Sequence, residues 1–543
     1  MPEEQKRNRR NSRAGRRRAS RVTRPSRSSF AAPRLVNLPH AHLFCFLGLS
    51  LLVAMFLHLS SDKFPDPDVF YHFRHAEIYG DAGAGGIFRT DFPWVHYSVI
   101  SRFSSDLWYG FHLVLVPFTW LGDSILGMKL AGIFVTFAFL VLYYLACGKL
   151  GVKPALFWPF FLLFSSAYLL HRLGMLRPQA LSLALSVYLF ALLAIGNIWG
   201  VFFAALASTC LHLNFFFVSF LILAVFAAIK IFNEKMVPWR ESVALVAGVV
   251  LGWLLRPNPL GAAKILYVQL FQLTLEKVGG IPLEFPSEMS PLRFRIYSNY
   301  LLFTLILLSS LLYLFWVLFK QNRRLSIQDR TVLLTSASLS VIFLLLSVLF
   351  ARRAFDFCSG FGVLLIALVF SRYLHENWPA RLALTCAFVF LVPYSLTLRN
   401  QVLSVGWDPH RFESGAKWIA ANSEPGEIVF NARWEYFPEL FFWNTKNFYS
   451  NGMDPIFQYA FDSDLYRKAY YLATDRMGQM VRSDTGDNEQ GSIDSYKILK
   501  EDFKARYVFL AKPFDRSLYF RLRRDSRFSL KLENDSSAVF QIN

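Results

Sequence analysis

The chain contains few charged residues. Asp, Glu, Lys and Arg together make up only 17% of its 543 residues, whereas an ordinary soluble domain carries about 25%. Apolar side chains take their place, because 54% of the residues are hydrophobic and 17% are aromatic. This composition excludes a typical soluble protein and indicates a chain that buries apolar surface in a membrane.

Cysteine is also scarce, and no C-x-x-C motif occurs. The five cysteines all fall in or beside apolar segments, and none has a neighbour at metal-ligand spacing. They are Cys45, Cys147, Cys210, Cys358 and Cys386. The pattern predicts small core residues rather than a zinc motif, and it gives no information about the redox compartment.

Acidic residues are missing from the beginning of the chain. Residues 6–34 contain twelve Lys and Arg and no Asp or Glu, in a Ser- and Asn-rich stretch that cannot fold alone. Such a tail is compatible with nucleic-acid binding. Because an apolar run follows directly, we favour a disordered cytoplasmic tail over residues 1–40 that contacts anionic lipid, with no nucleic-acid partner.

Apolar runs of membrane-spanning character recur through the first 400 residues. Together they predict an α-helical polytopic membrane protein with about 11–13 transmembrane helices. The segments are 41–60, 107–121, 125–147, 155–170, 178–196, 198–212, 214–231, 240–255, 297–319, 331–350, 355–371 and 382–398. The 107–121 segment is short and contains Pro117, so we expect it to be only half inserted.

Basic clusters between these segments predict their orientation. Residues 230–235, 320–324 and 372–381 are rich in Lys and Arg, which places them in the cytoplasm by the positive-inside rule. The loop 61–106 and everything after about residue 400 then lie outside. We expect a multi-pass protein of the plasma (inner) membrane.

The composition changes near residue 400. Polar residues become more frequent, and short β-prone runs appear at 427–430, 506–511 and 537–542, separated by helix-like stretches. We therefore predict a transmembrane domain over 41–399, with an external catalytic loop at 61–106, and an external soluble α/β domain over 400–543.

The loop after the first apolar segment gathers ionisable residues. Pro65 and Pro67 interrupt a helix and hold Asp66 and Asp68 beside it, with His72 one turn further on. Two carboxylates beside an imidazole can hold Mg²⁺ or Mn²⁺, or act as a general base. The same residues also fit a capped surface helix, and spacing alone does not separate these interpretations.

Three later segments also place charge at the predicted external face. Arg177 interrupts an apolar stretch, Glu288 lies in a proline-rich loop, and Arg352 and Arg353 stand between two apolar runs. Adjacent guanidinium groups suit a phosphate or diphosphate. The alternatives are an orientation signal for Arg177, a solvated connector for Glu288, and snorkelling for the arginine pair.

Read in order, these motifs resemble one family. The segments are Asp68-Val-Phe-Tyr-His-Phe-Arg74, Ser287-Glu-Met-Ser-Pro291 and Arg433-Trp-Glu-Tyr-Phe437. They are similar to motifs of the GT-C superfamily of membrane glycosyltransferases, and within it to the catalytic STT3 subunit of oligosaccharyltransferase. The resemblance covers nearly the whole chain after residue 40.

The resemblance implies roles for particular residues. The catalytic residues would be Asp68, Asp66 and Glu288, and the donor phosphate would be bound by Arg352, Arg353, Arg177 and Arg74. The acceptor would contact Trp434, Glu435 and Tyr436. A metal ion would be held by Asp68, Asp66 and His72. The implied reaction transfers a sugar or oligosaccharide from a polyprenyl-phosphate or -diphosphate donor to a glycolipid, polysaccharide or protein on the external face.

Two positions depart from the family pattern. Arg177-Pro178-Gln179 stands where the family has an acidic metal-binding pair, and Trp434-Glu435-Tyr436 matches only part of W-W-D-Y-G. These departures argue against a metal-dependent asparagine glycosyltransferase. A transporter or flippase of a lipid-linked glycan is the alternative class, although no inverted repeat is visible.

Overall fold

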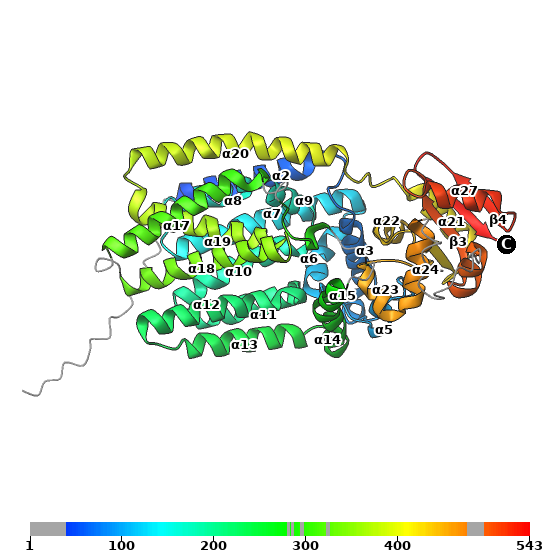
Figure 1. Cartoon of the computed structure of the whole chain (residues 1–543), viewed down its shortest axis with the longest axis horizontal. Coiled ribbons are helices and arrows are strands. Elements are labelled where there is room, and N and C mark those ends of the chain that lie inside the picture. The colour runs from blue at the N-terminus through cyan, green and yellow to red at the C-terminus, as the bar shows by residue number, and fades with distance from the viewer. Residues whose placement is uncertain (1–39, 280–282, 284–286, 294–297, 322–325, 475–493) are drawn as a thin grey trace, which may run out of the picture.

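In the computed structural model the chain forms a long helical bundle with a mixed α/β domain at one end (Figure 1). The structure describes residues 40–279, 283, 287–293, 298–321, 326–474 and 494–543. The basic tail predicted over 1–40 lies almost entirely outside the described residues.

All twelve apolar segments contain helices. The helices of the bundle are α2 (His40–Leu59), α6 (Tyr109–Thr119), α7 (Ser124–Lys149), α8 (Phe157–Ser165), α9 (Ala167–Gly174), α10 (Pro178–Ala194), α11 (Ile198–Leu211), α12 (Phe216–Glu234), α13 (Trp239–Leu254), α17 (Leu301–Gln321), α18 (Ile327–Leu349), α19 (Ala354–Val369) and α20 (Trp378–Ser404). The predicted polytopic helical fold is confirmed.

The described helices differ in length. Seven are long and apolar enough to cross a membrane, or up to nine if each of two bent pairs is one span. The remaining ones, such as α11 with 14 residues, are shorter than a full span. Because hydropathy marks any apolar helix, a count from sequence alone cannot separate complete spans from shorter buried helices.

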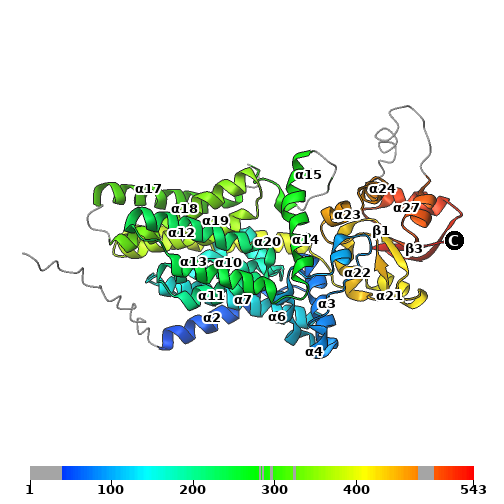
Figure 2. The same ribbon diagram turned by 90° about the horizontal axis from the view of Figure 1, so that it is seen from below.

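Helix α6 belongs to the shorter group. It has 11 residues and contains Pro117, so it extends over only about 16 Å. It lies at the end of the bundle nearest the α/β domain (Figures 1 and 2) and packs against α3 (Asp68–Asp81). This length agrees with the expectation that 107–121 does not cross a bilayer.

Several short helices gather at this same end. They are α3, α4 (Gly83–Gly86), α5 (Val99–Phe103), α14 (Pro259–Tyr267), the π-helical turn η3 (Val268–Gln272) and α15 (Leu273–Gly279). Figure 2 shows α14 and α15 projecting across the end of the bundle rather than along it. Together they form a layer between the bundle and the α/β domain.

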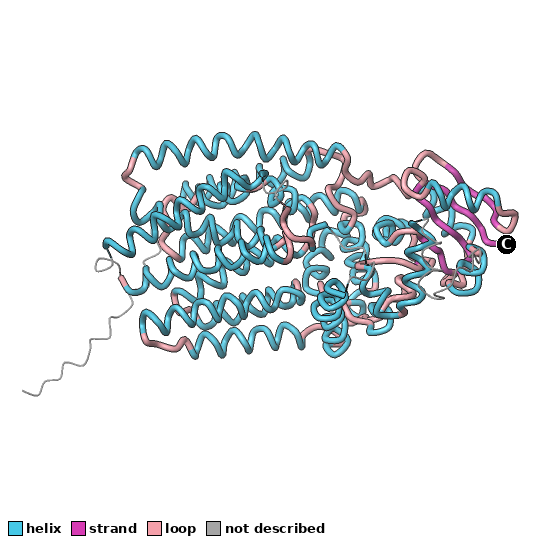
Figure 3. Tube along the Cα trace, in the orientation of Figure 1, coloured by secondary structure: helices cyan, strands magenta, loops and turns pink. Residues whose placement is uncertain are grey.

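The C-terminal domain contains a five-stranded sheet, the only strands among the described residues (Figure 3). Its order is β2-β1-β3-β5-β4, with β1 parallel to β2 and β3, and β5 antiparallel to β3 and β4. The strands are β1 (Ile428–Asn431), β2 (Phe448–Tyr449), β3 (Ala505–Ala511), β4 (Phe528–Glu533) and β5 (Ser537–Ile542). Three of them coincide with the β-prone runs, which confirms the predicted C-terminal α/β domain.

Helices surround this sheet and connect its strands. They are α21 (Glu413–Asn422), η8 (Trp434–Tyr436), α22 (Phe437–Trp443), α23 (Pro455–Phe461), α24 (Ser463–Thr474), α26 (Ser495–Lys497), η9 (Ile498–Asp502) and α27 (Arg516–Arg524). Of these, α22 packs against α3 of the bundle layer.

The loop 61–106 is built into the C-terminal domain. The Tyr449 amide donates to the Trp94 carbonyl over 2.8 Å, and the His96 amide donates to the Tyr449 carbonyl over 2.9 Å. The Phe70 ring lies 5.5 Å from that of Phe442 on α22. Tyr71 and Trp94 belong to the same hydrophobic core as residues of the C-terminal domain. The loop and this domain are therefore packed together.

Helices α11 and α13 pack closely along a stripe of small residues. Gly248 and Gly252 form a G-x-x-x-G pattern on α13, the spacing that lets two membrane helices approach. A Cβ atom at Gly248 would stand 2.3 Å from the Phe202 carbonyl oxygen. The close contact therefore requires glycine at this position.

We expect Gly248→Leu to destabilise the bundle, because a larger side chain in a packed contact costs about 1–3 kcal/mol. Val250→Leu is the matched control, since Val250 is 44% exposed on the same helix. Thermal unfolding in detergent measures the difference. Equal melting temperatures for the two variants would contradict this packing.

Candidate active site

The centre of the site is a guanidinium group surrounded by carboxylates. Arg177 Nη2 lies 2.7 Å from an oxygen of Asp66 and 2.7 Å from Asp68 Oδ2. Its Nη1 lies 3.3 Å from Glu288 Oε1. The structure thus brings together four residues that the sequence analysis selected from three separate loops.

A second arginine extends this cluster into the bundle. Arg172 Nη1 lies 2.6 Å from Glu288 Oε2, and its Nε lies 2.5 Å from Asp356 Oδ2. Glu288 therefore bridges two guanidinium groups. Buried charges are retained at reasonable cost only when they are paired and hydrogen-bonded in this way.

The positions where helices begin direct these side chains toward one another. Pro67 immediately precedes α3, so Asp68 is the first residue of that helix. Arg177 precedes Pro178 at the beginning of α10, and the axes of α9 and α10 differ by 119°. Proline at the first helical position fixes this start, which leaves Arg177 at the corner facing α3.

The carboxylates do not fit a divalent metal in this arrangement. A Mg²⁺ or Mn²⁺ ion bound by Asp66 and Asp68 needs their oxygens free to converge on it. Arg177 contacts both carboxylates, so its positive charge occupies the place of the cation. His72 is turned away, because its Nδ1 lies 2.8 Å from His112 Nε2.

A cavity of about 850 Å³ opens beside this cluster, between the bundle and the C-terminal domain. Its lining comes from both parts of the chain: Asp68, Trp108, Arg177, Gln179, His212, Asn214, Gln269, Leu273, Glu288, Met289, Arg353, Trp434, Pro438, Met453, Asp454, Pro455 and Ile456. The mixture of aromatic and polar side chains is typical of a small-molecule site.

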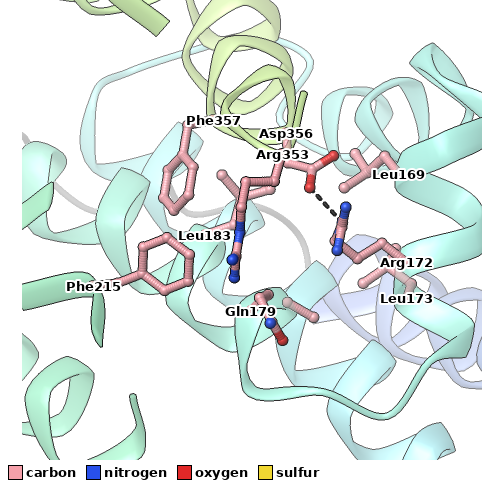
Figure 4. A pocket seen from close by; sticks show the side chains of 10 residues that line it. Leu169, Arg172, Leu173, Gln179, Leu183, Phe215, Arg353, Asp356 and Phe357 are labelled. Atoms are coloured by element: carbon pink, nitrogen blue, oxygen red, sulfur yellow. Dashed lines mark ion pairs between the residues drawn. The ribbon is translucent and has the colours of Figure 1, made fainter. Parts of the chain in front are cut away.

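Arg353 enters this cavity without a carboxylate partner among the described residues. Its Nη1 lies 2.9 Å from the Met289 sulfur, and its guanidinium carbon lies 5.2 Å above the centre of the Phe215 ring. Figure 4 shows it between Phe215 and the Arg172–Asp356 ion pair, above Gln179, at a second cavity of about 330 Å³. A buried guanidinium with this environment favours an anionic ligand.

The opposite wall consists of amides and a carboxylate. Asn214 donates to Gln269 over 2.6 Å, and Gln269 donates to Asp454 over 3.1 Å. Asn214 Oδ1, His212 Nε2 and Gln179 Oε1 are buried and, within the described ranges, have no hydrogen-bond partner. Buried polar atoms without partners are costly and indicate a missing ligand or water.

None of the sequence motifs pointed to this amide wall. Asn214 and Gln269 are single polar residues in apolar surroundings, and Asp454 follows a turn of the soluble domain. The available signal was a polar residue inside an apolar segment, which is expensive in a membrane unless it has a function.

The pKa values of Asp68 and Glu288 are shifted in opposite directions. Burial raises the pKa of Asp68 to about 7; Arg177 opposes this shift, whereas the nearby carboxylates reinforce it. Burial would also raise the pKa of Glu288, but Arg172 and Arg177 outweigh it and hold that pKa well below the usual range. Asp68 can therefore exchange a proton near neutral pH, and Glu288 stays ionised.

The remaining predicted residues lie at varying distances from the cavity. Trp434 lines it, whereas Glu435 is exposed and the Tyr436 hydroxyl donates to Asp515 within the C-terminal domain. Arg352 lies over the Tyr168 ring at 4.8 Å, and Arg74 pairs with Glu77 over 2.6 Å. Neither Arg352 nor Arg74 lines the 850 Å³ cavity.

Comparisons with known proteins place the fold. No protein-family model and no curated protein matches this sequence. A solved structure that is similar is the crystal structure of ArnT from Cupriavidus metallidurans bound to undecaprenyl phosphate. The similarity covers 92% of this chain and 98% of that chain, with a TM-score of 0.56 and 12% sequence identity. The chain therefore shares the overall fold of that structure.

We expect Arg177→Ala to destabilise the protein by about 3–5 kcal/mol, because it leaves Asp66 and Asp68 without their counter-charge and Glu288 with Arg172 alone. Arg240→Ala removes an exposed arginine and serves as the control. Thermal unfolding in detergent checks both. Melting of Arg177→Ala at the wild-type temperature would show that the ion cluster is not needed for stability.

Proposed function

We propose that the protein is a membrane glycosyltransferase that takes a sugar from a polyprenyl-phosphate or -diphosphate carrier and transfers it to a hydroxyl group on the external face. One observation carries this proposal. A single cavity contains a guanidinium without a carboxylate partner among the described residues, Arg353, and a carboxylate that titrates near neutral pH, Asp68. The similarity to ArnT, whose structure contains undecaprenyl phosphate, supports the carrier.

Arg353 binds the phosphate of the donor in this proposal. Arg177 and Arg172 are each engaged with two or more carboxylates, so their charge is largely balanced. Arg353 retains its charge for a ligand and stabilises the negative charge that develops on the phosphate oxygen as the glycosidic bond breaks.

Asp68 serves as the general base. It removes the proton of the acceptor hydroxyl, the acceptor oxygen forms a bond with the anomeric carbon, and the bond from that carbon to the phosphate oxygen breaks. The polyprenyl phosphate leaves with the electron pair, next to Arg353. Because the acceptor attacks opposite to the leaving group, the transfer inverts the anomeric configuration. Glu288 positions Arg177, which orients the base.

The amide wall is suited to recognise the sugar. Hydroxyl groups of a sugar both donate and accept hydrogen bonds, which matches Asn214, Gln269 and Asp454. Trp434 of the C-terminal domain lies at the cavity and offers a flat face for the acceptor. The partial W-W-D-Y-G match favours a glycolipid, polysaccharide or protein hydroxyl as acceptor over the asparagine acceptor of the STT3 family.

The orientation that we propose places this cavity outside the cytoplasm. The turn between α12 and α13 contains Lys235, and the π-helical segment η7 (Phe370–Leu374), which follows α19, contains Arg372. Both lie at the bundle end remote from the C-terminal domain (Figure 1). Basic residues at that end favour a cytoplasmic position, which puts the α/β domain on the outside of a plasma (inner) membrane.

A flippase of lipid-linked glycans is the rival function. The two functions differ in the fate of a labelled polyprenyl-phosphate sugar in membrane vesicles. A transferase consumes the donor and releases polyprenyl phosphate, whereas a flippase changes only the side on which the donor is found.

We expect Asp68→Asn to lower the transfer rate by a factor of about 10²–10⁴, because the amide cannot accept the acceptor proton. In the wild type the rate rises with pH through about 7, since the base acts in its deprotonated form, which predominates above its pKa. Donor consumption in vesicles measures both. Asp62→Asn, on the same loop but fully exposed, is the control; full activity of Asp68→Asn would contradict the assignment.

Binding of short-chain donors separates the phosphate and sugar contacts. Citronellyl phosphate is a short-chain analogue of polyprenyl phosphate that carries no sugar. We expect Arg353→Gln to weaken its binding by a factor of about 10–100, since a charge-assisted hydrogen bond is lost. Asn214→Ala should leave citronellyl phosphate unaffected and weaken its glycosylated forms by a factor of about 10. Calorimetric titration in detergent, with Arg240→Gln as control, checks this. Equal effects of the two variants on both ligands would refute the separation.

A further inference from the structure

A second polar cluster lies on another side of α3, and the transfer reaction does not use it. His75 on α3, Asp106 before α6 and His112 on α6 each offer one ligand atom, and these atoms all lie within 4.8 Å of one another. The His75 and His112 side chains are buried, as is Asp106 with 7% of its side chain exposed. Two imidazoles and a carboxylate from separate elements can hold a metal ion, which would replace the proton between His112 Nδ1 and Asp106 Oδ2.

The contacts around the three side chains leave one nitrogen of each histidine directed at the group. His112 Nδ1 lies 2.6 Å from Asp106 Oδ2, whereas its Nε2 faces His72 Nδ1 at 2.8 Å. His75 Nδ1 lies 3.2 Å from the Tyr71 hydroxyl, so its Nε2 is available. Ligating histidines commonly use their second nitrogen for such a contact.

The carboxylate is held in the same manner. Asp106 Oδ2 accepts a hydrogen bond from the Tyr79 hydroxyl over 3.0 Å, and Oδ1 accepts one from the Trp108 amide over 2.8 Å. The Asp106 carbonyl accepts from Arg256 over 2.9 Å. Supporting contacts of this kind orient ligands before a metal binds.

We propose that His75, Asp106 and His112 bind a transition-metal ion, with Zn²⁺ as the expected ion, that fastens the external loop to α6. Two imidazoles and one carboxylate suit Zn²⁺ rather than Mg²⁺ or Ca²⁺, which take oxygen ligands. A small cavity next to the group is lined by His75 and Asp106, and the fourth ligand would enter from this side.

This ion would act on the structure rather than on the transfer reaction. It joins α3 to the start of α6, and Asp68 is the first residue of α3. Arg177 contacts Asp66 and Asp68 where a metal would have to bind, so within the described residues we assign the metal to the histidine group.

Metal content of the full-length protein tests this site. The protein is purified in detergent with a tag that contains no histidine, dialysed, incubated with Zn²⁺ and desalted, and zinc is measured by mass spectrometry. We expect about one zinc per chain, and less than about a tenth of that for His112→Ala. His410→Ala, an exposed histidine of the C-terminal domain, should keep the full amount.

Cobalt provides a readout that needs no variant. Co²⁺ added to the metal-free wild type should give visible absorption bands of a four-coordinate ion, and Zn²⁺ should abolish them. A wild type that retains no zinc and gives no cobalt bands would overturn the proposal. So would a His112→Ala protein that binds as much zinc as His410→Ala. Neither result bears on the transfer reaction, which the donor assay measures separately.

Discussion

The contact of Arg177 with Asp66, Asp68 and Glu288 is the interaction on which the site depends. Without Arg177, the two loops that carry Asp66, Asp68 and Glu288 would hold three negative charges close to one another. In a cavity shielded from water, that repulsion is strong. The cluster therefore holds Asp68 at the cavity wall, and Arg177 contacts both aspartates where a divalent metal would have to bind.

The arginines divide into two groups by their partners. Arg172 and Arg177 are engaged with carboxylates and stabilise the loops. The Arg353 guanidinium contacts a thioether and an aromatic ring and has no carboxylate partner among the described residues, which is why we propose it as the phosphate ligand. The difference lies in the surroundings, because all three side chains have the same chemistry.

Helix α3 connects the two polar clusters in the layer of short helices. Its first residue, Asp68, faces the large cavity, and His72 and His75, one and two turns later, face α6. Phe70 and Tyr71 pack against α22 of the C-terminal domain. The α/β domain is thus part of the site, because it packs against the loop 61–106 and contributes residues to the cavity.

The sequence by itself determined the membrane class, the helical segments and three of the strands, because hydropathy and β-propensity are local properties of the chain. It also selected Asp66, Asp68, Arg177 and Glu288. Only the tertiary structure decided that these residues meet, since Asp66 and Arg177 are separated by 111 positions. The tertiary structure also shows that His72 contacts His112 rather than the aspartates, and it shows the amide wall. Such contacts depend on where helices break and turn, which no local pattern records.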